Sequence, residues 1–192
     1  MKIIIIGVVP FSLVNFRGDL IKALIREGHE VVAMANNATE SQILELSSYG
    51  AQYINYPVSR VGLNPISDLR TIYKLIRCFS EESPDCVLSY TIKPTIYGAI
   101  AAKFFPKIRF FAMITGLGYA FGDGGFFRVS LRTIILKLYR LALSSSIAVI
   151  FQNPDDKEVF VDLKLIPISK SFVVNGSGVN LKRFAYHGLN DK

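Results

Sequence analysis

Residues 2–10 read KIIIIGVVP, an unbroken run of apolar side chains apart from its first residue and its glycine. Such a run predicts a strand that is buried on both faces, because a strand with one wet face would alternate apolar and polar positions. Pro10 ends the run and no small-residue cleavage site follows, so the stretch does not resemble a secretory signal. A strand buried on both faces is typical of a parallel sheet.

The rest of the chain alternates strands and helices. After the strand at 3–9, further strands are predicted at 30–35, 52–56, 86–89, 109–114, 147–151 and 171–174. Helices are predicted at 18–28, 39–48, 65–80, 94–104, 126–143 and 154–160. This alternation predicts an α/β fold, a Rossmann-like parallel sheet of about seven strands with helices on both faces. Ligands of such sheets bind at the carboxyl ends of the strands, so the candidate site lies in the loops 10–17, 57–64, 89–94, 115–125 and 175–180.

The net charge of +7 is unevenly distributed along the 192 residues. Residues 1–100 hold nine basic and nine acidic side chains, whereas residues 101–192 hold thirteen basic and six acidic ones. The excess predicts an anionic partner: nucleic acid, a phosphate-bearing ligand or an anionic membrane surface. No nucleic-acid partner is expected, because a sheet of buried strands lacks the aromatic platform of single-strand binders. Two cysteines and no histidine cluster predict no metal site.

Three loops carry polar residues that suit an anion. The first loop lacks the G-x-G-x-x-G pattern, which disfavours a nicotinamide or flavin cofactor, so no cofactor is expected. Asn15 and Arg17 precede the predicted start of a helix, where anions bind well, although Asn15 could equally cap that helix and Arg17 could be solvated. Arg60 is open to a ligand role. Lys93 stands just before Pro94 at a predicted helix start, where it faces an anion or is an ordinary surface lysine.

Residues 114–127, ITGLGYAFGDGGFF, are rich in glycine. They follow the fifth predicted strand and lack the Lys-Ser of a Walker loop, so a nucleotide-binding phosphate loop is excluded. Glycine still lets a backbone approach a ligand closely. The stretch beside Thr115 can therefore form an anion nest of backbone N–H groups.

The predicted helix 126–143 is basic and carries no acid. Helical spacing assigns one broad apolar arc to the core, namely Phe127, Leu131, Ile134, Ile135, Leu138, Leu141 and Ala142. A second, narrower apolar row consists of Val129, Leu136 and Leu143, and basic side chains flank it on both sides. The row and its flanking residues form the predicted membrane-facing set: Arg128, Val129, Arg132, Leu136, Lys137, Arg140 and Leu143. An apolar row between basic rows favours an anionic membrane surface. The alternative is that another domain covers this helix.

Four motifs together resemble a known family. The series SYTIKPTIYGAIAAK (89–103), RFFAMITGLGYAF (109–121), FQNPDD (151–156) and NGSGVNLKRF (175–184) is similar to the N-terminal half of GT-B-fold, family-4-like retaining glycosyltransferases that build capsule, O-antigen and related bacterial surface glycans. The resemblance implies a Rossmann-like acceptor-binding domain at 1–180. It also implies that 181–192 begin the connection to a donor domain carrying an E-x7-E motif, which is absent here, so the chain is truncated or a separate chain supplies that domain.

The resemblance also assigns positions to the cleft. Asn15 and Arg17 would lie in its first loop, and Lys93 and Thr95 would flank the acceptor. Thr115, Gly116, Leu117 and Gly118 would line the cleft floor near the transferred sugar and its diphosphate. Many relatives carry histidine where this sequence has Thr115, so no catalytic side chain is assigned. Retaining transfer in this fold is thought to depend on positioning and on stabilisation of the leaving phosphate.

The implied function is transfer of a hexose or N-acetylhexosamine from a nucleotide-sugar to a glycan acceptor, with polyprenyl diphosphate as the expected carrier. Such a protein would be cytoplasmic and peripheral at the inner face of the cell membrane, and this chain would be inactive without the donor-binding domain. Two alternatives remain open: a non-catalytic subunit that recruits a split glycosyltransferase to the membrane, and a sugar-nucleotide epimerase-like protein.

Overall fold

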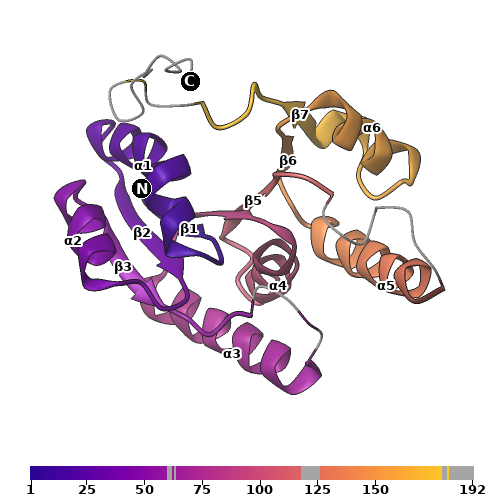
Figure 1. Cartoon of the computed structure of the whole chain (residues 1–192), viewed down its shortest axis with the longest axis horizontal. Helices are drawn as coiled ribbons and strands as arrows, with labels where there is room; N and C mark the ends of the chain where they lie inside the picture. The colour runs from indigo at the N-terminus through magenta and orange to yellow at the C-terminus, as the bar shows by residue number, and fades with distance from the viewer. Residues whose placement is uncertain (60–61, 63, 118–125, 179–180, 182–192) are drawn as a thin grey trace, which may run out of the picture.

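The computed structural model describes residues 1–59, 62, 64–117, 126–178 and 181, with the backbone alone for residues 126–129. Within this part the chain forms one parallel sheet with helices on both faces (Figure 1). The strands are β1 (Lys2–Ile6), β2 (Glu30–Ala35), β3 (Gln52–Asn55), β4 (Cys86–Tyr90), β5 (Arg109–Ile114), β6 (Ala148–Phe151) and β7 (Ser171–Val173). The predicted fold class is confirmed.

The opening apolar run forms an interior strand of the sheet. The seven strands follow the order β3-β2-β1-β4-β5-β6-β7, so β1 pairs with β2 on one side and β4 on the other. The side chains of Ile4, Ile5 and Ile6 are fully buried, as the absence of alternation predicted. The strand order reverses beside β1, and this is the position at which doubly wound sheets bind their ligands.

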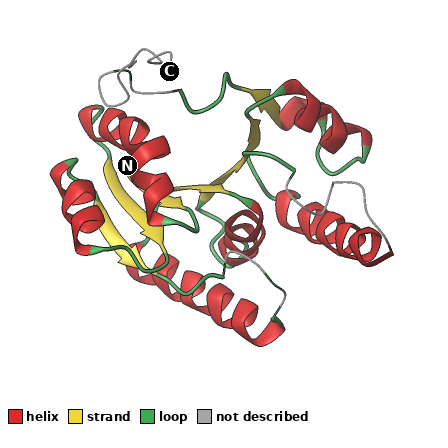
Figure 2. Cartoon of the chain, viewed as in Figure 1, coloured by secondary structure: helices red, strands yellow, loops and turns green. Residues whose placement is uncertain are grey.

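Six α-helices connect the strands (Figure 2). They are α1 (Pro10–Arg26), α2 (Glu40–Ser48), α3 (Pro65–Glu82), α4 (Ile92–Ala102), α5 (Phe126–Leu143) and α6 (Pro154–Asp162), and a short 3₁₀ helix, η2 (Ile168–Lys170), precedes β7. Side chains of α1 and α2 join the core on the face that carries Ile3 and Ile5. Side chains of α3 to α6 join the core on the opposite face, with Ile4 and Ile6. None of the helices in the described part combines the length and the apolar character needed to cross a bilayer.

The start of α1 differs from the prediction. The helix begins at Pro10, eight residues before the predicted start at Gly18, because proline fits the first helical turn and the preceding Val9 is extended. Gly18 is an interior residue, and a Cβ there would come within 3.2 Å of the Tyr49 ring, so close packing explains this glycine. Residues 10–17 are therefore helix, and Asn15 and Arg17 lie on α1 instead of in a loop.

The orientation of α5 also differs from the prediction. Of the predicted membrane-facing set, Leu143 is buried and Leu136 packs against the core. Ile134 and Leu141, which were assigned to the core, are 49% and 56% exposed. The side chains of Arg128 and Val129 lie outside the described residues, whereas Arg132, Lys137 and Arg140 are exposed. At Leu136 and Leu143, the two described positions of the predicted apolar row, the side chains therefore face the core and not a membrane.

The buried Tyr139 explains this rotation of α5. Its ring packs edge-to-face on Phe160 of α6, with ring centroids 5.1 Å apart, so the helix turns this side toward the sheet. The apolar arc that the sequence assigned to the core did not include Tyr139. The exposed Arg140 donates from Nη2 to the carbonyl oxygen of Leu163 at 2.9 Å.

Candidate anion-binding site

A pocket lies at the carboxyl ends of the inner strands of the sheet. Its volume is about 810 Å³, and residues from α1, β4, α4 and the segments after β5, β6 and β7 line it. Among the residues predicted for the site, Arg17, Lys93, Thr115 and Gly116 meet there. Arg60 and Gly118 lie outside the described residues.

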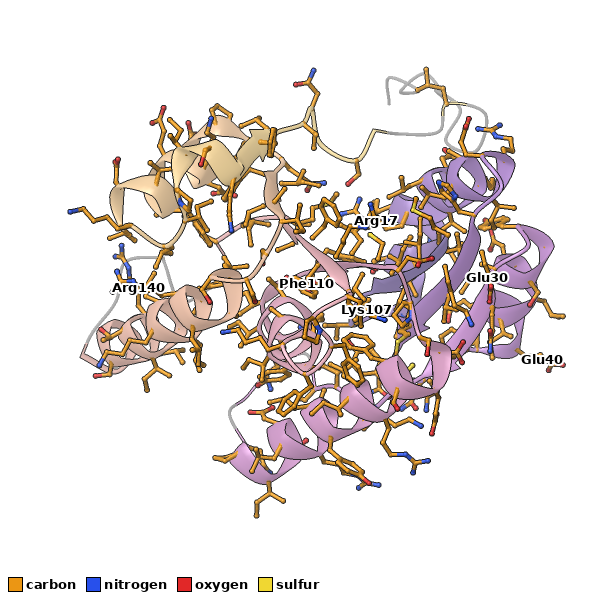
Figure 3. The ribbon with its side chains drawn as sticks, turned by 180° about the vertical axis from the view of Figure 1, so that it is seen from behind. Arg17, Glu30, Glu40, Lys107, Phe110 and Arg140 are labelled. Atoms are coloured by element: carbon orange, nitrogen blue, oxygen red, sulfur yellow. The ribbon has the colours of Figure 1, made fainter. Side chains whose placement is uncertain are left out.

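Arg17 is the buried cation of this pocket, and only 4% of it is exposed (Figure 3). Its guanidinium carbon lies 4.8 Å from the centroid of the Tyr90 ring. Nη1 donates to the Ser177 hydroxyl oxygen at 2.6 Å and to the carbonyl oxygen of Phe16 at 3.0 Å. Nε is buried and has no hydrogen-bond partner within the described part. One donor of the guanidinium is therefore available to a ligand.

Within the described part of the pocket, the positive charge of Arg17 has no carboxylate to balance it. None of the described lining residues is Asp or Glu. Burial lowers the pKa of Arg17 from its usual value, and the neighbouring Tyr90 acts weakly in the opposite sense. A buried cation without a counter-ion is costly, and a bound anion relieves that cost. The pocket therefore favours an anionic ligand.

Tyr90 fixes the position of Arg17. The Ser12 hydroxyl donates to the carbonyl oxygen of Val9 at 2.7 Å, so it accepts the hydrogen bond from the Tyr90 hydroxyl, also at 2.7 Å. Burial raises the pKa of Tyr90 to about 12, which keeps the phenol protonated as this donor. A Cβ on Gly7 would overlap the Tyr90 ring and hydroxyl, so glycine at the end of β1 makes room for the ring.

Lys93 lines the pocket but has a partner of its own. It lies in the first turn of α4, two residues inside a helix that starts earlier than predicted. Its Nζ lies 2.9 Å from the Asp68 carboxylate of α3, and both side chains are mostly buried. Burial and a hydrogen bond with the same carboxylate raise the pKa of Tyr97. Lys93 is thus neutralised by an ion pair, and Arg17 supplies the uncompensated charge.

Two predicted residues do not reach the pocket. Asn15 lies on α1 and donates from Nδ2 to the carbonyl oxygen of Phe11 at 2.9 Å. Thr95 is fully buried in α4, and its hydroxyl lies 3.4 Å from that of Ser89. Asn15 was placed in a loop because α1 was predicted to start at Gly18 and not at Pro10. Thr95 was assigned to the cleft from the family resemblance alone.

Two backbone positions beside the pocket are unusual. Gly116 lines it with φ +144, a conformation that favours glycine, and a Cβ there would meet open space. Thr91, the residue before α4, has φ +68, and its hydroxyl oxygen is buried without a partner among the described residues. Strained non-glycine residues concentrate at functional sites. The remainder of the predicted glycine-rich nest, from 118 to 125, lies outside the described residues.

The mouth of the pocket is apolar. Val9, Phe11 and Phe16 line it and are exposed, and the two phenylalanine rings meet edge-to-face with centroids 6.1 Å apart. Gln152 and Ser177 complete the polar wall, where the Gln152 amide donates to the Ser177 hydroxyl oxygen at 2.7 Å. The pocket therefore combines a buried cation with an apolar lip, which suits an amphiphilic anion.

Sequence reasoning missed Ser12, Tyr90 and Ser177. Tyr90 ends β4 and Ser177 follows β7, so the rule that ligands bind at strand ends could have pointed to both. Ser12 could not be found, because its role depends on the early start of α1. The described residues contain no cluster of metal-ligating side chains.

Comparison with known proteins gives a family. A profile of proteins described as glycosyl transferase 4-like matches residues 11–153. The N,N'-diacetylbacillosaminyl-diphospho-undecaprenol alpha-1,3-N-acetylgalactosaminyltransferase of Campylobacter jejuni subsp. jejuni serotype O:2 is 32% identical over 174 residues, which are 90% of this chain and 45% of that protein. The chain thus spans less than half the length of this relative.

Solved structures give the same fold. MurG of Acinetobacter baumannii superposes with a TM-score of 0.60 at 16% identity, over 100% of this chain and 47% of its own. A UDP-GlcNAc 2-epimerase of Neisseria meningitidis gives a TM-score of 0.63 at 16% identity, over 92% and 47%. At such identities the likeness shows the fold alone, and it agrees with the predicted N-terminal half of a GT-B fold. With the profile over most of its length and a transferase relative at 32% identity, the chain belongs to the glycosyl transferase 4-like family.

Proposed function

We propose that this chain is the acceptor-binding half of a retaining glycosyltransferase, and that the acceptor is a sugar carried on a polyprenyl diphosphate. The single observation that carries the proposal is the buried, pocket-lining Arg17: among the described residues its Nε has no hydrogen-bond partner and no lining carboxylate balances its charge. A diphosphate supplies oxygen acceptors for this donor, and charge-assisted hydrogen bonds of this kind are strong. The apolar lip of Phe11 and Phe16 offers a surface for the first prenyl units.

The family and its relative support the chemistry. The relative's name describes N-acetylgalactosamine transfer and a diphospho-undecaprenol substrate, and 90% of this chain aligns with it. For this chain we infer a nucleotide-sugar as donor, a hexose or N-acetylhexosamine as the transferred group, and a place at the inner face of the membrane where the acceptor resides. Donor binding belongs to a further domain, in the same or a separate chain. The pocket residues hold and orient the acceptor, and no proton transfer is assigned to them.

The test is acceptor binding by calorimetry. The ligand is a short-chain polyprenyl-diphosphate-linked N-acetylhexosamine, and the same sugar without diphosphate serves as the comparison. We expect Arg17→Gln to weaken binding of the diphosphate ligand by about 10- to 100-fold, which corresponds to one or two charge-assisted hydrogen bonds. Arg26→Gln, at the exposed end of the same helix, should leave binding unchanged. Equal binding of both sugars would refute the proposal, and tighter binding of UDP-GlcNAc than of the acceptor would favour an epimerase-like protein instead.

A further inference from the structure

The outer face of α3 carries a row of large apolar side chains. Ile66, Leu69 and Tyr73 are 81%, 66% and 62% exposed. Their spacing of three and four residues aligns them along one side of the helix over its first two and a half turns. The opposite side of α3 holds Leu75 and Phe79 in the core. The row is therefore not a frayed core contact, because the same helix has a separate and well-buried face.

A basic row lies next to this apolar row. Arg70, Lys74 and Arg77 follow the same three- and four-residue spacing along the adjacent side of α3. Arg77 pairs with Glu81 on the surface, whereas the structure shows no acidic partner for Arg70 or Lys74 among the residues it describes. The helix presents apolar and cationic side chains side by side.

The acids of α3 do not cancel this charge. The helix has three acidic residues, and each is held in an ion pair: Asp68 with Lys93, Glu81 with Arg77, and Glu82 with Lys2. Asp68 and Glu82 are mostly buried in their ion pairs. The outer face of α3 is therefore positively charged.

We propose that this face of α3, formed by Ile66, Leu69, Arg70, Tyr73 and Lys74 and called here the α3 surface, lies against an anionic lipid bilayer. The apolar row enters the headgroup boundary and the basic row meets lipid phosphates. The phosphates of a nucleic acid would pair with the basic row but would leave the apolar row in water. A bilayer accommodates both rows, and a tyrosine suits its interface. The proposal rests on the proposed function, because the acceptor's prenyl chain resides in that bilayer.

The α3 surface begins close to the pocket. Asp68, on the inner side of the same turn of α3 as Ile66 and Leu69, forms its ion pair with the pocket-lining Lys93 at 2.9 Å. A bilayer on the α3 surface would therefore lie about one helix diameter, roughly 10 Å, from this edge of the pocket, within reach of a lipid-borne ligand. The exposed Ile134 and Leu141 of α5 form the rival surface. Its Arg140 is hydrogen-bonded to the Leu163 carbonyl and lies well apart from Arg17 (Figure 3).

The experiment is sedimentation of this chain with phosphatidylcholine vesicles, with and without about 30 mol % phosphatidylglycerol. We expect binding to the anionic vesicles to fall more than tenfold in the double variant Leu69→Ser/Tyr73→Ser. Each of Arg70→Gln and Lys74→Gln should weaken it by about fivefold. Leu44→Ser, at an equally exposed site on α2 across the sheet, is the matched control and should bind as the original chain does. All the substituted side chains except the half-buried Lys74 are exposed, so the fold should persist, which circular dichroism verifies.

The outcomes separate this proposal from the proposed function. The Leu69→Ser/Tyr73→Ser variant should keep its affinity for the short-chain acceptor in detergent-free solution, and Arg17→Gln should keep its affinity for vesicles. Unchanged vesicle binding by the α3 variants would overturn the α3 surface. Loss of binding in Ile134→Ser/Leu141→Ser alone would assign the membrane contact to α5 and overturn it as well. Equal binding to neutral vesicles would remove the role of the basic row.

Discussion

Arg17 is the residue that most directly indicates ligand binding. It is buried on α1, and its contacts among the described residues are a serine hydroxyl, a backbone carbonyl and the Tyr90 ring. Buried arginines are usually balanced by a carboxylate, because desolvating a charge costs several kcal/mol. This site leaves the charge unbalanced and surrounds it with a pocket. The arrangement stabilises the protein less than an apolar side chain could, so its presence in a pocket points to ligand binding.

The close approach of Gly7 to the Tyr90 ring, which contacts Arg17, can be tested by substitution. Gly7→Ala should displace the Tyr90 ring, lower the free energy of unfolding by about 1–3 kcal/mol and weaken acceptor binding, since Arg17 loses its support. Urea denaturation and calorimetry measure the two effects. The matched control is Gly28→Ala, where φ is +80 and a Cβ meets open space. It should cost about 1 kcal/mol of stability and leave binding unchanged. Equal binding losses in both variants would contradict the role of Gly7.

The helices show where sequence patterns succeed and fail. The existence and type of all six were predicted, because each carries a clear helical period between strands. The starts of α1 and α4 were predicted wrongly, because Gly18 and Pro94 were taken as helix boundaries although both lie inside a helix. The face that α5 buries also escaped prediction. Its amphipathic pattern has two apolar rows, and only packing against α6 determines which of them is buried.

Two neighbouring helices are joined by the Asp68–Lys93 ion pair, which gives a second prediction. Because both side chains are mostly buried, a double-mutant cycle of Asp68→Asn and Lys93→Met should give a coupling free energy of about 1–3 kcal/mol. The exposed Arg77–Glu81 pair on α3 is the control, and its coupling should stay near about 0.5 kcal/mol. Urea denaturation of the original chain, the four single variants and the two double variants provides the values. Equal coupling in both pairs would show that the Asp68–Lys93 pair is as solvated as a surface pair.

For the molecule as a whole, the sequence predicted the architecture better than the site. The seven parallel strands could be predicted from buried runs such as residues 3–6, because such runs alternating with helices are compatible with few other architectures. Strand ends also located the pocket correctly at Lys93, Thr115 and Gly116. The support of Arg17 by Tyr90 and Ser177 joins segments far apart in the sequence, so no local pattern contains it.

The buried tyrosines predict how the whole fold responds to alkali. Burial raises the pKa of Tyr90 to about 12 and also raises those of Tyr56 and Tyr139. In the unfolded chain these phenols ionise near their ordinary pKa of about 10, so the unfolded state loses protons that the folded state keeps. Each tyrosine therefore lowers the free energy of unfolding by about 1.4 kcal/mol per pH unit as the pH rises from about 10 to about 12. Urea denaturation across this range should give a shallower decline for Tyr139→Phe than for the original chain. Parallel declines for the two proteins would mean that Tyr139 ionises equally in both states, which its burial in the core between α5 and α6 should prevent.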